Sequence, residues 1–318
     1  MTVLKLAKYG KDKVRVFRIV RGTDGTHQVA EWIVCALIEG QLTMAMVHSD
    51  IAEAWTHSDN KKIVTTDAIK NMTYYFSKKS QHCLQPEKFA LEFAMHLLTF
   101  YPQVHKSHVE VQQLKWTRIQ VKGQPHKHSF VRDGDEKRLT SVTLDATKGK
   151  QNITGSVTSG IKDLLVLKST GSSFEDYVVD KFTTLKPVND RIFSTAVDCS
   201  YTIPLSPSAT TPSSLPNLSI DFNHIYNSVL TTTLETFAQH DSASVQATLY
   251  EMCQKILKDN KQVEQVTYKL PNKHYFAVNM SYIGEENINP KHAEVFMPVD
   301  APSGLIIATV ARDEQSKL

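Results

Sequence analysis

Residues 86–100 read PEKFALEFAMHLLTF, and their pattern predicts an amphipathic helix that packs on a sheet. Proline suits the first helical position, where its missing N–H group is not needed. The large apolar residues then recur at helical spacing, which places them on one face. These residues are Phe89, Phe93, Leu97 and Phe100.

Extended segments flank this helix on both sides. Before it, two segments rich in branched residues surround a glycine-containing turn, which predicts a β-hairpin, and another helix follows them. After it, two more extended segments are joined by a turn. The strands are expected at Val14–Val20, Val29–Ile38, His108–Ile119 and from Ser129, the turns at Gly22–Gly25 and Lys122–Pro125, and the other helix at Asp67–Lys79.

The second half of the chain repeats this order of elements. Extended segments are followed by two helices, each preceded by a capping residue, and then by alternating apolar residues around a Pro-Asn-Lys turn. A Ser-, Pro- and Thr-rich loop, Ser206–Ser219, separates the strands from the helices. The strands are expected at Leu164–Lys168 and Arg191–Tyr201, the helices from Asp221 and Ser244, and a hairpin from Val266 to Tyr282 that turns at Pro271–Lys273.

Two copies of a strand, strand, helix, helix, strand, strand unit predict the α+β class, with antiparallel sheets that carry helices on one face. The units are expected at residues 1–148 and 149–312, with a tail at 313–318. Open sheets have edges that need covering, so we expect edges to pair between subunits and close the sheets into a barrel.

The composition excludes several classes of protein. Of the 318 residues 41% are apolar, which is enough for two cores, and a net charge of +3 is too small to favour nucleic acid as a partner. No apolar run reaches the length of a membrane-spanning helix, and no secretory signal is visible. Four scattered cysteines without a CxxC pair argue against a disulfide framework and a cysteine zinc site.

The last three residues, Ser316, Lys317 and Leu318, match a tripeptide that the peroxisomal import receptor reads at the end of a chain. An ordinary charged tail is the alternative interpretation. Because the terminal position is part of the signal, we expect the protein in the peroxisome, with this receptor as a partner.

Several ordered motifs resemble the urate oxidase (uricase) family over nearly the whole chain. The longest is LLVLKSTGSSFEDYVVDKFTTLKPVNDR at residues 164–191. The other motifs are Tyr9–Lys11, Val64–Lys70 (VTTDAIK), Trp116–Arg118, Pro125–Arg132 (PHKHSFVR), Ser242–Thr248 (SASVQAT) and Leu270–Phe276 (LPNKHYF).

This resemblance implies a fold, an assembly and a reaction. The fold would be two tandem tunnelling-fold (T-fold) units, and four chains would form a hollow barrel with active sites between subunits. The reaction would be oxidation of urate by O2 and water to 5-hydroxyisourate and hydrogen peroxide, without a metal or an organic cofactor.

The resemblance assigns substrate binding to Arg191, Gln246, Phe174 and the backbone N–H of Val245. A guanidinium holds the edge of a planar anion with paired donors, and an amide both donates and accepts along that edge. An aromatic ring lies flat against a purine. Taken singly, each of these residues has an ordinary structural explanation, and only their joint match to ordered motifs favours a ligand.

The resemblance also implies a proton relay of Lys11, Thr66 and His274. Lys11 would take a proton from urate through the Thr66 hydroxyl, and His274 would exchange protons with water. A lysine acts as a base only when burial or a neighbouring cation lowers its pKa, so we expect Lys11 to be partly buried.

For Asn272 and Asp67, the sequence leaves two interpretations open. Asn272 would position oxygen or the attacking water above the purine, but the Pro-Asn-Lys sequence is also explained by a turn. Asp67 would give a backbone N–H to urate, while its carboxylate is equally suited to cap the following helix.

Other features limit the assignment. His126 and His128 form an HxH pair, but two ligands are too few for a metal site, so we interpret them as structural. Glu175 and Asp176 follow Phe174 where many relatives carry large apolar residues. A purine-binding or structural protein that has lost turnover is the alternative function, and a metal-dependent pterin enzyme of the same fold is a third, disfavoured one.

Overall fold

The computed structural model describes residues 2, 4–40, 51–205, 218–289 and 292–313. Most of the predicted loop Ser206–Ser219 and the terminal Ser316–Leu318 lie outside the described residues. The chain forms two compact units. Unit 1 comprises residues 1–160 and 202–223, and unit 2 comprises residues 161–201 and 224–318.

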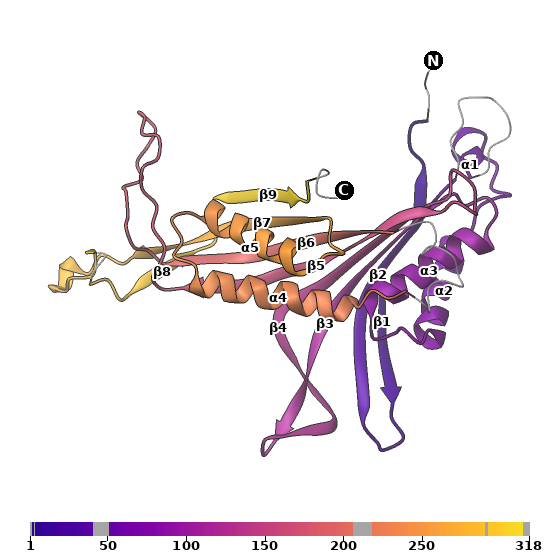
Figure 1. The fold of residues 1–318 in the computed structure, drawn as a ribbon, viewed down its shortest axis with the longest axis horizontal. Coiled ribbons are helices and arrows are strands. Elements are labelled where there is room, and N and C mark those ends of the chain that lie inside the picture. The colour runs from indigo at the N-terminus through magenta and orange to yellow at the C-terminus, as the bar shows by residue number, and fades with distance from the viewer. Residues whose placement is uncertain (1, 3, 41–50, 206–217, 290–291, 314–318) are drawn as a thin grey trace. The chain divides into compact units, whose positions relative to one another are not determined.

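Unit 1 is an antiparallel sheet with helices on one face (Figure 1). Its strands pair in the order β1-β2-β3-β4-β5, while α2 packs on β1, and α3 packs on β3 and β4. The elements are β1 (Lys8–Arg21), β2 (His27–Glu39), α1 (Glu53–Thr56), α2 (Thr66–Lys79), α3 (Pro86–Phe100), β3 (Lys106–Val121), β4 (Gln124–Asp145) and the first part of β5 (Thr154–Lys168).

The core of unit 1 follows from the alternation along β2. The even-numbered residues Trp32, Val34, Ala36 and Ile38 are buried on the side of the helices. The predicted helix at residues 86–100 is confirmed, and its face is confirmed for Phe89, Phe93 and Leu97, which are fully buried. The prediction that Phe100 belongs to this buried face is wrong, because Phe100 ends the helix and is 63% exposed. Its ring stacks on the ring of His96, with centroids 5.0 Å apart.

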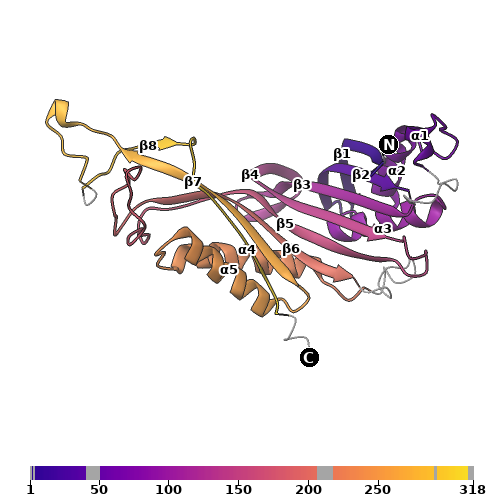
Figure 2. The ribbon, with the colours of Figure 1, turned by 90° about the horizontal axis from the view of Figure 1, so that it is seen from above.

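Unit 2 repeats the arrangement of an antiparallel sheet and two helices (Figure 2). Its strands pair in the order β5-β6-β7-β8, with β9 also paired to β7, and α5 packs on β7 and β9. The elements are the remainder of β5, β6 (Phe193–Leu205), α4 (Phe222–Gln239), α5 (Val245–Asp259), β7 (Gln265–Ala277), a 3-10 turn (Ser281–Ile283), β8 (Phe296–Val299) and β9 (Leu305–Ala311).

The predicted hairpin turn at Pro271–Lys273 is wrong, because β7 runs straight through it from Gln265 to Ala277. The strand changes partner there instead. Residues 265–271 pair with β9, and residues 274–277 pair with β8. Proline has no N–H to donate to a ladder, so the break between two partners is a position that tolerates it. Asn272 still bonds across the break, donating its N–H to the Gly304 carbonyl at 2.7 Å.

Both halves therefore show the α+β class with antiparallel sheets that the sequence predicts. Within the described residues, no helix is long and apolar enough to cross a membrane.

Candidate functional site

The predicted site residues fall into two clusters, one in each unit. Lys11, Thr66 and Asp67 belong to unit 1. Phe174, Arg191, Val245, Gln246, Asn272 and His274 belong to unit 2.

Lys11 reaches the helix-covered side of the sheet because β1 contains a β-bulge. Val14 pairs with Val34, whereas Lys11 pairs with Ala36, so β1 has one residue more than β2 in this interval. Residues opposite each other in a ladder share a face, and Val34 and Ala36 are both buried under the helices. Without the extra residue, Lys11 would lie opposite Leu37 and point away from α2. The Lys11 side chain is half-buried, as expected.

The two residues before Lys11 hold β1 against its neighbours. Tyr9 accepts the N–H of Val64 on its phenolic oxygen at 2.9 Å, which ties β1 to the chain leading into α2. Gly10 lies so close to β2 that a Cβ atom would stand 1.9 Å from the Ala36 carbonyl oxygen. The Tyr-Gly-Lys motif thus fixes the strand that carries the lysine.

Thr66 and Asp67 are exposed residues in the first turn of α2. The cap is Thr65, whose hydroxyl accepts the Ala68 N–H at 3.1 Å, so the alternative that Asp67 caps the helix is wrong. The Asp67 carboxylate instead binds Lys70 at 2.5 Å and Asn71 at 2.9 Å. These contacts lower the pKa of Asp67, chiefly through the Lys70 hydrogen bond and charge, with a smaller effect from the charge of Lys11.

The unit 1 cluster is therefore suited to an anion. The first N–H groups of an α-helix have no acceptor within the helix and carry partial positive charge. Thr66 carries its hydroxyl in this first turn, and the charge of Lys11 acts on Asp67 there, so donors of three kinds are available to an anion.

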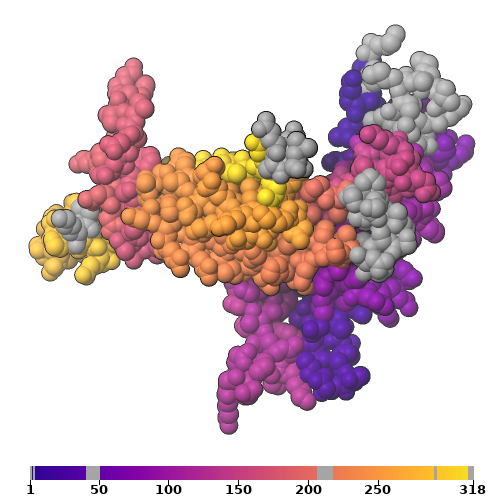
Figure 3. All heavy atoms as spheres, in the orientation of Figure 1, coloured from indigo at the N-terminus to yellow at the C-terminus, as the bar shows by residue number. Residues whose placement is uncertain are grey.

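In unit 2, the segment between β5 and β6 projects from the surface (Figures 1 and 3). Its two ends are joined by backbone hydrogen bonds. Phe174 and Val188 exchange N–H to carbonyl bonds of 2.8 and 3.1 Å, and the Arg191 N–H donates to the Ser172 carbonyl at 2.8 Å. These bonds bring Arg191 next to Phe174, although they are far apart in the sequence.

The Arg191 guanidinium lies over the Phe174 ring, with Cζ 5.1 Å from the ring centroid. Tyr177 stacks on the same ring at 5.0 Å and 14°. Burial lowers the pKa of Arg191, but a guanidinium stays charged at neutral pH. The result is a half-buried cation beside aromatic surface, which is suited to a planar anion. Glu175 and Asp176 point into solvent beside it.

The N-terminus of α5 is tied to this cluster. Ser173 donates its N–H to the Ser242 carbonyl at 2.8 Å, and Ser242 donates its own to the Gly171 carbonyl at 3.0 Å. Ser244 caps α5 by accepting the Ala247 N–H at 3.1 Å, which confirms the predicted helix start.

Val245 and Gln246 therefore occupy the first turn of α5. Val245 is buried at 3% exposure, and Gln246 is exposed. The motifs of Phe174, Arg191 and Gln246 thus meet in one region of unit 2.

Two residues that the sequence did not single out support this region. Asp190 accepts the Thr170 hydroxyl at 2.7 Å and the Gly171 N–H at 2.9 Å, which braces the segment that holds Arg191. Lys168 donates to the His240 carbonyl at 2.7 Å, in the loop that leads into α5. The partners of both residues are brought close only by the fold, so no spacing in the sequence could reveal them.

Asn272 and His274 are half-buried on β7, on either side of the point where that strand changes partner. His274 pairs with Val299 of β8, and its ring stacks on Phe276 at 6.0 Å. Because they are two residues apart on one strand, their side chains share a face.

His126 and His128 lie on β4 with ring centroids 4.6 Å apart. Arg118 donates to the carbonyls of His126 and Lys127 at 2.8 and 2.6 Å, so this motif braces the hairpin of β3 and β4. Over the described part of the chain, no three His, Cys, Asp or Glu side chains are grouped as metal ligands would be.

The regions of similarity to known proteins include the residues of both clusters. The family model described as Uricase matches residues 7–143 and 157–307. The chain is 39% identical to the uricase of Aspergillus flavus over 321 residues, spanning 100% of both chains, and 40% identical to that of Schizosaccharomyces pombe over 312 residues, spanning 98% of both. The crystal structure of uricase from Arthrobacter globiformis superimposes with a TM-score of 0.83 at 30% identity and covers 99% of this chain and 96% of that one. This chain belongs to the uricase family.

Proposed function

We propose that this protein is a urate oxidase, which converts urate, O2 and water to 5-hydroxyisourate and hydrogen peroxide. The observation that carries the proposal is the Uricase match, because its two ranges contain every residue of both clusters. The two relatives compared over their full lengths are themselves named uricases.

In this proposal the unit 2 cluster binds the substrate. Arg191 offers paired donors to one edge of the urate anion, and Phe174 supplies a ring against which the purine lies. Gln246 both donates and accepts along the other edge, next to the Val245 N–H. The closeness of the Arg191 guanidinium to the Phe174 ring supports placing both residues in one binding site.

The unit 1 cluster and His274 move protons. Lys11 takes a proton from urate through the Thr66 hydroxyl, which can accept and donate at once. The Asp67 N–H at the start of α2 holds the anion that results. His274 exchanges protons with water, and Asn272 positions oxygen or water above the ring. The urate dianion is electron-rich enough to reduce O2 itself, so the reaction requires neither a metal nor an organic cofactor.

Oxygen uptake by purified protein tests this function. Chelator-treated protein with its metal content measured should consume urate and O2 in equal amounts and release equal peroxide. Urate binding without oxygen uptake would instead favour the non-catalytic alternative, and activity that returns only with added metal would contradict a cofactor-free reaction.

Variants separate the roles of the two clusters. Lys11→Ala and Thr66→Ala should lower kcat far more than urate affinity, whereas Arg191→Ala should weaken urate binding severely. Equal losses of binding in all three variants would contradict the assignment.

We further propose that each half is a T-fold unit, that four chains form a barrel, and that each active site lies between subunits. In the described residues β1 pairs only with β2, so its outer edge is open to a partner. Mixing Lys11→Ala subunits with Arg191→Ala subunits tests the shared site. If Lys11 and Arg191 of one site come from different chains, hybrid tetramers contain some intact sites and regain activity. Hybrids that stay inactive, with tetramers confirmed by light scattering, would refute the shared site.

The terminal Ser316–Leu318 tripeptide is proposed to direct the protein to the peroxisome. A fluorescent protein fused ahead of the chain should colocalise with a peroxisomal marker, and deletion of Leu318 should leave it in the cytosol. Unchanged import after the deletion would contradict this role.

A further inference from the structure

A pocket of about 500 Å³ lies in unit 1 between β1 and the C-terminal half of α2. Lys11 and Thr66 lie at the opposite ends of the same two elements, so the pocket is separate from the unit 1 cluster. Its charged lining residues are Arg15, Arg18, Arg21 and Lys78, and no Asp or Glu lines it within the described part of the chain.

Most of these cations lack a carboxylate partner. Arg15 is paired with Glu31 at 2.5 Å. For Arg18, Arg21 and Lys78, the described residues provide no ion pair, and the buried Nε of Arg18 has no hydrogen-bond acceptor. Like charges that share a pocket repel one another, and an anion bound between them reduces this repulsion.

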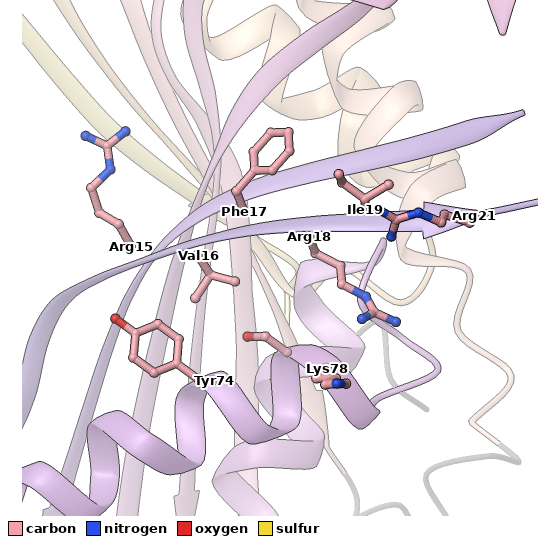
Figure 4. Close-up of a pocket in the computed structure, with 9 residues that line it drawn as sticks. Arg15, Val16, Phe17, Arg18, Ile19, Arg21, Tyr74 and Lys78 are labelled. Atoms are coloured by element: carbon pink, nitrogen blue, oxygen red, sulfur yellow. The ribbon is translucent and has the colours of Figure 1, made fainter. Parts of the chain in front are cut away.

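Two of these cations, Arg18 and Lys78, lie between β1 and α2 (Figure 4). Arg18 extends from β1 toward Lys78 on the last turn of α2, while Arg15 and Phe17 point to the other side of the strand and Arg21 lies next to Ile19. Tyr74, on the same side as Lys78, adds a hydroxyl group.

The dipole of α2 does not explain this group of cations. The C-terminal end of a helix favours positive charge, which accounts for Lys78 and Lys79. It does not account for Arg18, because Arg18 comes from β1 and, within the described part of the chain, donates no hydrogen bond to a carbonyl of α2. A planar guanidinium next to an ammonium is instead the combination that binds phosphate oxygens.

We propose that the pocket lined by Arg18, Lys78 and Tyr74 binds a phosphate-class oxyanion, either free phosphate or the phosphate group of a small ester. The guanidinium of Arg18 and the ammonium of Lys78 are its main contacts. This site binds its ligand independently of urate and of both clusters described above.

Calorimetric titration of the purified oligomer with inorganic phosphate, at constant ionic strength set by chloride, tests the proposal. The wild-type protein should bind phosphate saturably, with a Kd of about 1 mM or tighter. Arg18→Gln and Lys78→Gln should each weaken binding by roughly tenfold or more, because each removes a hydrogen bond between charged groups. Lys79→Gln is the matched control: it removes the same charge one residue away, outside the pocket, and should change the Kd less than twofold.

A parallel titration with a nucleoside monophosphate identifies the source of the oxyanion. Tighter binding than that of phosphate indicates a phosphate ester, and equal or weaker binding indicates free phosphate; both support the site. The proposal is overturned if wild-type protein shows no saturable binding, as it would if a second copy covered the pocket. It is also overturned if Lys79→Gln weakens binding as much as Lys78→Gln, since the attraction would then be diffuse. Circular dichroism of each variant checks that the fold is retained.

Discussion

Replacing Arg138 by alanine should destabilise unit 1 by about 3–5 kcal/mol, because it leaves the Glu87 carboxylate buried without its cation. Glu87 is fully buried, at 0% exposure, and accepts Arg138 Nε at 2.9 Å, Arg138 Nη2 at 2.7 Å and the Ser159 hydroxyl at 2.5 Å. Arg138 also donates to Asn223 Oδ1 at 2.8 Å and to the Phe222 carbonyl at 3.2 Å.

The magnitude follows from what each variant leaves behind. Arg138→Ala removes two charge-assisted bonds to Glu87, each contributing about 1.5–3 kcal/mol, and strands the acceptor in the core. The double variant Glu87→Leu with Arg138→Met leaves no buried charge, so it should be more stable than Arg138→Ala alone. Arg15→Ala is the control. Its ion pair with Glu31 has an arginine that is 65% exposed, and its loss should cost less than about 1 kcal/mol.

Urea unfolding followed by circular dichroism at one fixed protein concentration measures these differences, since assembly also affects apparent stability. A loss below about 1 kcal/mol for Arg138→Ala would refute the reasoning. The reasoning would also be refuted if the double variant lost as much unfolding free energy as Glu87→Leu and Arg138→Met lose together as single variants. The two residues would then show no energetic coupling.

Three further substitutions test how the clusters are held. Gly10→Ala should cost about 1–3 kcal/mol and lower the melting temperature, because its Cβ would meet the Ala36 carbonyl; an unchanged Tm would contradict the close approach. Ser244→Ala should cost about 1 kcal/mol in urea unfolding, and Ser244→Asp should restore it, whereas equal stability of all three proteins would argue against the cap. Asp190→Asn should raise the KM for urate more than it lowers kcat, because it loosens the brace beside Arg191, and a changed kcat with the wild-type KM would rule this out.

The local elements could be predicted from the sequence because their signals are local. Pro86 sits at the first turn of α3, and Ser244 caps α5. The turn at Lys122 and Gly123, both with positive φ of 51° and 78°, joins β3 to β4 where the sequence placed it. Each signal depends on a few neighbouring residues.

The course of β7 could not be predicted, because it depends on partners from elsewhere in the chain. Pro271 and Asn272 have turn-forming chemistry, yet β9 and β8 hold the strand straight from both sides of the break. Local preference gave way to pairing with segments that follow much later in the sequence.

The sequence motifs name the candidate site residues, but they do not reveal how the fold holds those residues in place. Ordered motifs named Lys11 and Arg191, whereas alternation along β1 would place Lys11 on the wrong face. The brace formed by Asp190 and the link from Lys168 to the loop before α5 depend on backbone carbonyls and N–H groups, which have no signature in the sequence.

The extra residue in β1 also divides that strand into two segments, each with its own alternation of side chains between the two faces of the sheet. Residues 14–21 keep one alternation, which sets the cationic pocket, and residues 8–11 keep another, which aims the lysine at α2. Transplanting the lysine onto another hairpin would fail if only Tyr9–Lys11 were copied, because a regular ladder would turn the amine outward. The transferable unit is the motif together with its bulge, including Lys13 in its left-handed conformation at φ 56°.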